Sequence, residues 1–315
     1  MKALHLICSR TLLAAITLLL VSVFVFSAVE MMPGDAAGRI LGRLATAENQ
    51  AVLRQKLNLD APAAERYFTW LKGLVSGDLG RSLTTDRPIS EVLAPRILNT
   101  LLLAVAALFL YAPMVVVPAI LQAVYRDGPI DHALSTVTLV LYSIPDYLLG
   151  TLLLLLFVVV LPWFPATSLV DASTGWKEFA VALVLPALTL SIVMAAYAVR
   201  MLRDSLIEIL QSDFVRFAVL NGLPFRQVVL RHALPNALIP TLNVTALNLG
   251  YLIGGVVVVE KVFSFPGFGS LLVDALLLRD LPLIQTTVMI AAATYVVANL
   301  MADAAAIYLN PRLRT

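Results

Sequence analysis

The chain has 315 residues, of which 60% are hydrophobic and only 13% are charged, and its formal net charge is +2. Soluble domains carry about 25% charged residues, so this composition excludes an ordinary soluble protein. The mean hydropathy of +0.91 instead indicates an integral membrane protein.

Long uncharged runs predict the membrane spans, because a spanning helix needs about 20 apolar residues. Five runs are uninterrupted, and a further apolar region is broken only by Asp146. In chain order, the predicted spans lie within residues 11–29, 97–125, 133–170, 179–199, 233–259 and 281–302. The sequence therefore predicts an all-α, integral membrane helical bundle of six transmembrane helices.

The first run differs from a cleaved signal peptide, the alternative for an N-terminal apolar segment. It is longer than the roughly 7–15 apolar residues of a signal peptide and is not closed by an A-x-A pattern. An even number of spans places both termini on one side of the membrane. Lysines and arginines of the short connections gather on that side, so the positive-inside rule predicts both termini in the cytoplasm.

The segment after the first span, residues 31–96, is then external, and its pattern indicates a small helical fold. Thr46 is expected to cap a helix over residues 47–59, and Pro62 to begin a second helix. The expected apolar face of that second helix consists of Tyr67, Phe68, Trp70, Leu71 and Leu74, and turns are expected at Gly77, Gly80 and Pro88. Two roles stay open for this segment: a structural cap over the bundle, or a docking surface for another protein.

The connection at residues 200–240 is polar, contains five arginines and stands late in an otherwise apolar chain. A helix is expected to end at Asn221-Gly222, residues that tolerate a left-handed turn. Pro224 suits the first turn of a new helix, and residues 225–233 mix apolar and cationic side chains. Pro235 and Pro240 are predicted to end this short helix and to start the fifth span. Such a helix fits the groove of another protein, and the alternative is an amphipathic helix lying on lipid headgroups.

This connection carries a resemblance to a known family. Gly222, nine further residues and then His-Ala-Leu-Pro at 232–235 resemble the cytoplasmic loop of permeases of binding-protein-dependent ABC importers. Arg216, Phe217 and Ala218 stand where the general pattern has Glu-Ala-Ala, a departure that resembles the peptide/nickel branch. Segments 33–35, 57–83, 143–150, 252–269, 299–303 and 310–312 also resemble that branch, in order along the chain. The chain is identified as similar to its first (B-type) permease subunit.

The resemblance implies the type I importer organisation, with 1–30 as the cytoplasmic end and first span, 31–96 external, 97–309 as permease core with a coupling loop at 200–236, and 310–315 cytoplasmic. The implied location of the chain is the cell inner membrane. The implied partners are a second (C-type) permease, two ATPase subunits, an extracytoplasmic substrate-binding protein and the lipid bilayer; no nucleic acid is expected. The implied cargo is a dipeptide, oligopeptide or related solute, with nickel-chelate or glutathione import as the alternative.

No catalytic residue and no cofactor are expected in this chain. It contains no G-x4-G-K-[ST] loop for a nucleotide, so ATP and Mg are expected to bind the ATPase subunits. Its single cysteine and three separated histidines give no metal cluster. A secondary transporter and a membrane-embedded enzyme are the distant alternatives, and neither explains the basic loop at 200–240.

Three groups of candidate residues follow. The ATPase coupling loop is expected to use Arg216, Ala218, Gly222, Pro224, Phe225, Arg226, Val229, Leu230, Arg231, Leu234 and Pro235. Candidates for a polar pathway inside the membrane are Asn99, Asp146, Asn243, Asn248, Asn299 and Asp303, although capping, pairing or hydrogen bonding between helices stays the alternative for each. An external re-entrant or scoop loop is expected at Phe263, Pro266, Gly267 and Gly269.

Overall fold

The computed structural model describes residues 2–31, 46–56, 61–170 and 173–309. The described residues form helices joined by turns, and the all-α prediction is confirmed. The chain divides into two compact units, one made of residues 1–98 with 267–315 and the other of residues 99–266.

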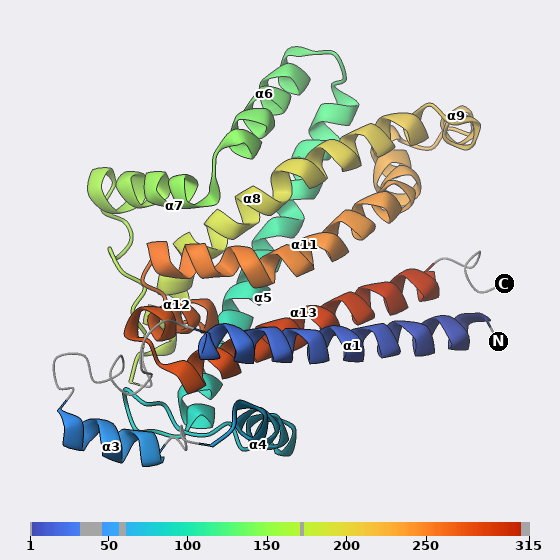
Figure 1. The fold of residues 1–315 in the computed structure, drawn as a ribbon. Coiled ribbons are helices and arrows are strands. Elements are labelled where there is room, and N and C mark those ends of the chain that lie inside the picture. The colour runs from blue at the N-terminus through green and yellow to red at the C-terminus, as the bar shows by residue number, and fades with distance from the viewer. Residues whose placement is uncertain (1, 32–45, 57–60, 171–172, 310–315) are drawn as a thin grey trace. The chain divides into compact units, whose positions relative to one another are not determined.

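The first unit is built on the first and last long helices, α1 (Lys2–Glu30) and α13 (Leu281–Leu309). They pack side by side and run antiparallel, so the beginning of α1 and the end of α13 lie at the same end of the pair (Figure 1). This arrangement agrees with the predicted even number of crossings.

The external segment contains the two expected helices, α3 (Ala47–Lys56) and α4 (Ala63–Ser76). Residues 57–59, the expected end of α3, lie outside the described residues. Helix α4 ends at Gly77, whose φ of +83° is left-handed as the turn prediction requires. Tyr67 and Trp70 contact Phe26 of α1, with ring centroids 5.4 and 5.9 Å apart, whereas Phe68 is 66% exposed. The prediction that Phe68 shares this inner face was wrong, because one residue along a helix turns the side chain by about 100°.

A buried aspartate ties the external segment to the start of α13. Asp280 follows the short helix α12 (Phe268–Leu278) and is fully buried. Its carboxylate accepts hydrogen bonds from the hydroxyls of Ser82 (2.6 Å) and Thr84 (2.9 Å) and from the backbone N–H of Leu283 (3.3 Å). One carboxylate thus both caps α13 and fixes the turn before α5.

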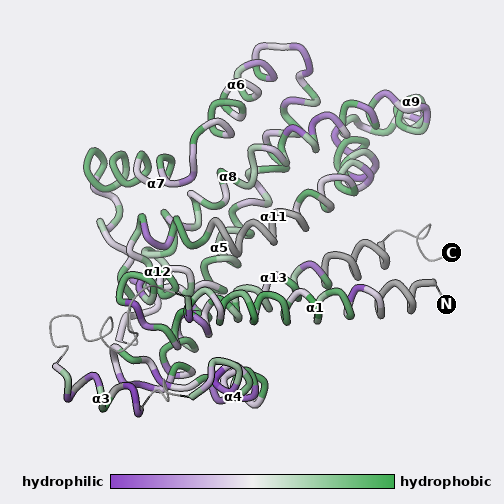
Figure 2. Tube along the Cα trace, viewed as in Figure 1, coloured by the Kyte–Doolittle hydropathy of each residue, from purple (hydrophilic) through white to green (hydrophobic). Residues whose placement is uncertain are grey.

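The second unit contains the other helices of the chain. They are α5 (Ile89–Val124), which begins in the first unit, α6 (Pro129–Ser143), α7 (Asp146–Leu154) with the π-helical η2 (Leu155–Val160), α8 (Trp176–Leu210), α9 (Asp213–Leu220), α10 (Phe225–Gln227), the π-helical η3 (Val228–Ala233) and α11 (Leu234–Val262). Their core is lined by residues such as Leu103, Tyr111, Leu190, Leu202 and Phe263. Figure 2 shows hydrophobic residues along α5 and α7 and hydrophilic residues gathered around α9.

Four described helices are long and apolar enough to cross a membrane, namely Ser9–Glu30, Ile89–Val124, Trp176–Leu210 and Leu281–Leu300. The region 133–170, predicted as one span, is instead divided into α6 and α7 with η2, which are bent by 107°. Pro145 explains the division, because the residue before a proline is driven out of helical geometry and Ile144 is extended at φ −86°, ψ 126°. The 29-residue helix α11 covers the predicted fifth span.

Candidate coupling surface and the network behind it

The turn between α9 and α10 has the geometry expected from its sequence. Gly222 has a φ of +81°, and its N–H donates to the carbonyl of Val219 (3.0 Å). Apart from the glycine itself and its two chain neighbours, no heavy atom lies within 4 Å of the position that a Cβ would occupy. The glycine is therefore required for its backbone conformation and not for close packing.

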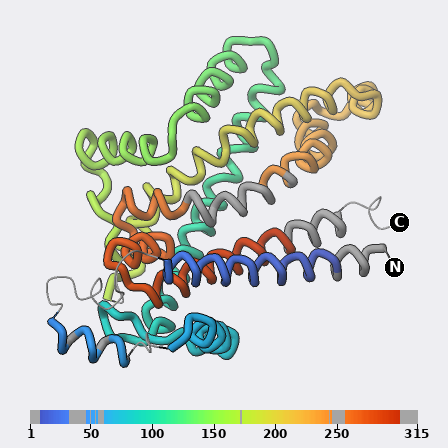
Figure 3. The backbone as a smooth tube through the Cα atoms, in the orientation of Figure 1, coloured from blue at the N-terminus to red at the C-terminus, as the bar shows by residue number. Residues whose placement is uncertain are grey.

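The short helix after this turn continues without interruption into the membrane span (Figure 3). Phe225–Gln227 leads into the π turn Val228–Ala233, and Ala233 and Leu234 both keep right-handed helical angles. The prediction that Pro235 and Pro240 end the short helix was wrong. The N–H of Leu234 donates to the carbonyl of Val229, five residues back, so a wider turn precedes Pro235 and the helix absorbs a residue that lacks an N–H.

The segment 213–235 has an inner and an outer face. On the inner face, Val215, Val228, Val229 and Ala233 are each at most 4% exposed, and the segment packs on α8. The outer face carries exposed apolar side chains together with three exposed arginines. We call this outer face the coupling surface; it consists of Phe214, Arg216, Phe217, Leu220, Phe225, Arg226, Leu230 and Arg231.

The remaining predicted loop residues take supporting positions. Val229 is 4% exposed and anchors the inner face. Ala218 and Leu234 are half-buried, whereas Pro224 and Pro235 are exposed at the two ends of the short helix. A mixed apolar and cationic outer face held on a buried inner face is suited to a protein groove with acidic residues.

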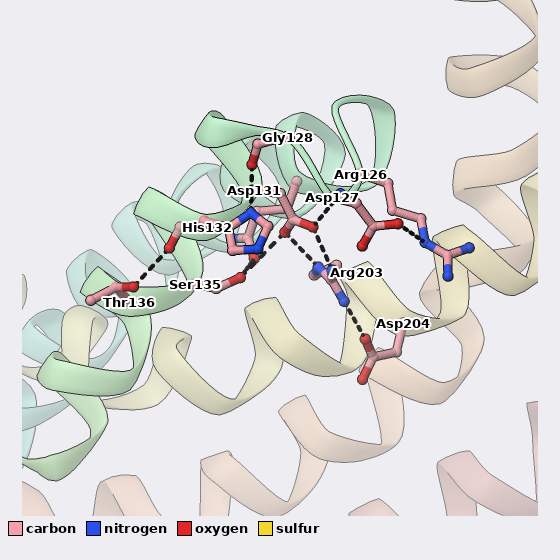
Figure 4. A network of polar contacts seen from close by, with 10 residues as sticks. Arg126, Asp127, Gly128, Asp131, His132, Ser135, Thr136, Arg203 and Asp204 are labelled. Carbon is pink, nitrogen blue, oxygen red and sulfur yellow. Dashed lines mark hydrogen bonds and ion pairs between the residues drawn. The ribbon is translucent and has the colours of Figure 1, made fainter.

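An ion pair joins the start of α6 to the last part of α8 (Figure 4). Arg203 donates from Nε to one carboxylate oxygen of Asp131 (2.8 Å) and from Nη2 to the other (2.6 Å). Asp131, in the first turn of α6, is 3% exposed and also accepts from the N–H of Asp127 (3.0 Å). Arg203 reaches Asp204 as well (2.9 Å). The two-point geometry fixes the guanidinium in one orientation.

The same network extends to α5. The hydroxyl of Ser135 lies 3.3 Å from Asp131 Oδ1 and 3.0 Å from Gln122 Oε1. Since a hydroxyl has one hydrogen, it serves one of these acceptors at a time. Gln122 is 2% exposed, and its Nε2 has no hydrogen-bond partner. Side chains of α5, α6 and α8 therefore meet in one polar cluster that holds these helices together.

Sequence reasoning missed this cluster. Asp131 and Arg203 are 72 residues apart, and both lie just outside uncharged runs, where charged residues are ordinary. The available signal was Gly128-Pro129, which predicts a helix beginning and places Asp131 in its first turn.

The predicted pathway residues that the structure describes differ in their contacts. The amide of Asn99 donates to the carbonyl of Pro266 (2.9 Å), which matches the hydrogen-bonding alternative. Asp146 accepts from the N–H of Tyr147 (2.9 Å) at the start of α7, and Asn299 is exposed on α13. The side chains of Asn243, Asn248 and Asp303 lie outside the described residues.

The predicted scoop loop is a packed turn followed by a short helix. Phe263 is 1% exposed and its carbonyl accepts from the N–H of Ser168 (2.9 Å). Pro266 is half-buried, and Gly267 and Gly269 are buried at the start of α12. Ser264 is exposed at a φ of +54°. Another molecule could therefore contact this turn mainly at Ser264.

Close packing explains the glycine at position 150, in the apolar stretch after Pro145. A Cβ at this position would lie 3.2 Å from a ring carbon of Phe263 and 3.3 Å from a methyl group of Val262. The glycine therefore lets α7 approach the end of α11. Among the described residues, no group of three or more His, Cys, Asp and Glu side chains is placed to hold a metal ion.

Comparison with known proteins gives two family matches. Residues 114–315 match the model "Binding-protein-dependent transport system inner membrane component", and residues 3–104 match the corresponding N-terminal model. The glutathione transport system permease protein GsiC of Escherichia coli O6:H1 is 36% identical over 298 residues, which cover 95% of each chain. The proteins of the same name from Escherichia coli K12 and Salmonella choleraesuis show the same identity and coverage.

Proposed function

This chain belongs to the family of binding-protein-dependent transport system inner membrane components, the permeases of ABC importers, and on that premise we propose that its coupling surface receives the force of a separate ATPase subunit. The observation that carries the proposal is the outer face of segment 213–235. It exposes apolar and cationic side chains at the end of the second unit, and its inner face is packed on α8. A surface patch of this composition is typical of a protein interface.

We propose as partners a second permease, two ATPase subunits and an extracytoplasmic substrate-binding protein, with the bilayer around them. ATP and magnesium belong to the ATPases in this proposal. The permease contributes half of the pathway and the helix that receives the ATPase movement. With the six crossings and cytoplasmic termini predicted from the sequence, the coupling surface lies on the ATPase side in this proposal, and the arginines of that connection support it.

The helical continuity from Phe225 into α11 supports the mechanical part of the proposal. An ATPase changes transport only by stabilising one conformation of the pathway more than another. Moving an equilibrium from 1:99 to 99:1 requires about 5.5 kcal/mol of differential binding. A docking helix that continues directly into a span, with Val228 and Val229 buried behind it, moves the span when it moves.

For the cargo, we propose a small peptide-like solute. Relatives of 36% identity are named for glutathione transport, and glutathione, itself a small peptide, is the first solute to test. Dipeptides and oligopeptides belong to the same chemical class. A nickel chelate is the alternative of different chemistry.

The first test is purification of the chain in detergent from its host, with co-purifying proteins identified by mass. A second permease, two ATPases and a binding protein are expected. A chain that transports without any ATPase contradicts the proposal.

The second test is charge reversal on the coupling surface in the reconstituted complex. Arg231→Glu is expected to lower ATPase activity stimulated by the loaded binding protein, without loss of membrane insertion. The matched control is Arg126→Glu, since Arg126 is exposed in the α5–α6 connection and outside the coupling surface. Equal stimulation in wild type and Arg231→Glu removes this residue from the ATPase contact.

A further inference from the structure

Helix α4 carries three distinct stripes. Tyr67, Trp70 and Leu74 form the inner stripe, half-buried toward α1. Glu65, Thr69, Lys72 and Ser76 form an exposed polar stripe, following one another at helical spacing. Ala64, Phe68 and Val75 form a third stripe, which is apolar and exposed; Phe68 is 66% and Val75 82% exposed. An external helix surrounded by water has no reason for a second apolar stripe.

The contacts of α4 place it alongside the membrane span α1 and not beyond its end. The hydroxyl of Tyr67 lies 2.9 Å from that of Ser22, and Arg66 pairs with Glu30 at 2.5 Å. Ser22 and Glu30 are eight residues apart, which is about 12 Å along a helix. Because Ser22 lies inside the apolar run 11–29, α4 covers the outer two turns of the span, at the depth where headgroups meet acyl chains.

The apolar stripe is continuous with the exposed apolar surface of α1. A groove of about 350 Å³ lies between the two helices, and its lining includes Val23 and Phe26 of α1 and Ala64 and Phe68 of α4. Val23 is 46% exposed, and its neighbour Phe24 is 73% exposed. The covering that α1 requires as a membrane span therefore extends without interruption onto α4.

We propose that α4 is an interfacial helix whose Ala64–Phe68–Val75 stripe binds the phospholipids of the outer leaflet. The polar stripe faces headgroups and water, and the aromatic side chains of Tyr67 and Trp70 lie at the boundary that such rings prefer. This assigns α4 to the lipid surface. The inference depends on α1 being a membrane span and does not depend on the coupling proposal.

The test uses spin labels on the full chain, co-purified with its partners and reconstituted in phosphatidylcholine vesicles. The single native cysteine is first changed to serine (Cys8→Ser). Labels are then attached in separate variants at Phe68→Cys and Val75→Cys in the apolar stripe, with Thr69→Cys and Lys72→Cys as matched controls in the polar stripe. Relaxation by oxygen, which enters lipid, is compared with relaxation by a water-soluble nickel chelate.

The expected result is a higher ratio of oxygen to nickel relaxation at 68 and 75 than at 69 and 72, following the helical period of about 3.6 residues. Equal ratios at all four positions would show that the stripe lies in water and would overturn the proposal. Protection of 68 and 75 from both reagents would overturn it too, because protein would then cover the stripe. The label at Val75 is the cleaner probe of the two. Phe68 also contacts Tyr67 edge to face, with ring centroids 5.4 Å apart, so replacing Phe68 perturbs that contact.

Discussion

Replacing Asp131 with asparagine should loosen the ends of α6 and α8 while leaving the rest of the bundle intact. In the structure, both oxygens of Asp131 accept from Arg203, at 2.8 and 2.6 Å. Asparagine keeps the shape of the side chain but presents one NH2 group to a cation that can only donate. One charge-assisted bond is lost, and the guanidinium loses its buried counter-charge.

The size of the effect follows from the burial of the two partners. Removing one member of a buried ion pair costs about 3–5 kcal/mol. The side chain of Arg203, however, is 22% exposed and keeps Asp204 at 2.9 Å, so water and a second carboxylate offset part of the loss. We expect a cost of about 2–3 kcal/mol, which corresponds to a change of about 30- to 150-fold in an opening equilibrium.

The assay is hydrogen exchange of the backbone amides in the detergent-solubilised complex, followed by mass spectrometry. Peptides from residues 129–143 and 200–210 are expected to lose protection by that factor, and peptides from residues 281–300 serve as an internal control. Asp204→Asn is the matched variant, because it removes an exposed carboxylate and is expected to cost below about 1 kcal/mol. The double variant Asp131→Asn with Arg203→Gln should recover part of the loss, since it leaves no unpaired buried charge.

Two results would refute this reasoning. If Asp131→Asn changes exchange no more than Asp204→Asn does, the pair is worth no more than an ordinary surface ion pair. If the double variant loses the sum of both single effects, Asp131 and Arg203 act independently, and the network does not hold α6 to α8.

Three further predictions concern single positions. At Gly222, alanine should destabilise the turn by about 1–2 kcal/mol because φ is +81°, whereas asparagine should destabilise it less because it tolerates this region. The stimulated ATPase activity of the reconstituted complex should therefore fall more in Gly222→Ala than in Gly222→Asn. Gly150→Val should lower the free energy of unfolding by about 1–3 kcal/mol through overpacking against Phe263, measured by thermal unfolding in detergent. Asp280→Ala should cost about 1–3 kcal/mol, because it removes a helix cap and leaves the buried hydroxyl of Ser82 without its acceptor; faster proteolysis within residues 77–88 is the measurement.

Each of these predictions has its own control. A Gly222→Asp variant as active as wild type would show that this turn neither positions the helix nor touches the ATPase. Gly150→Ala adds only one methyl group at the tight contact and should be milder than Gly150→Val. Asp280→Asn retains an oxygen for the cap but loses the charge, so proteolysis of this variant as slow as that of wild type would exclude the charge-assisted bonds as the reason for the burial of Asp280.

The sequence allowed the class of protein and the main turns to be predicted, because these depend on local properties. Apolar runs predict membrane helices, and the left-handed turn at Gly222 follows from the residue type. The helical continuity through Pro235 was not predictable in this way. A π turn depends on which carbonyl each N–H selects, and no residue between Val228 and Ala233 reports that choice.

Polar contacts between residues far apart in the sequence could not be predicted either. Nothing near Asp131 indicates that Arg203 is its partner, and nothing near Asp280 indicates Ser82, since each pair forms only when distant helices pack. The division at Pro145 lies between these cases. Proline predicts a break in a helix, but the angle of 107° follows from how α6 and α7 pack on their neighbours.

The π turn between the short helix at Phe225 and α11 also preserves the rotational phase between them. Successive residues of an α-helix are separated by about 100°, and a π turn contains one residue more than an α turn. A π turn therefore takes up its extra residue within one turn, so deleting one residue within Val228–Ala233 would restore α geometry and leave Phe225 and Arg226 in nearly the same direction relative to the span. The direction in which these side chains meet another protein is therefore kept despite the extra residue, whereas deleting a residue from the α-helical part of α11 would rotate them by about 100° relative to the rest of the span.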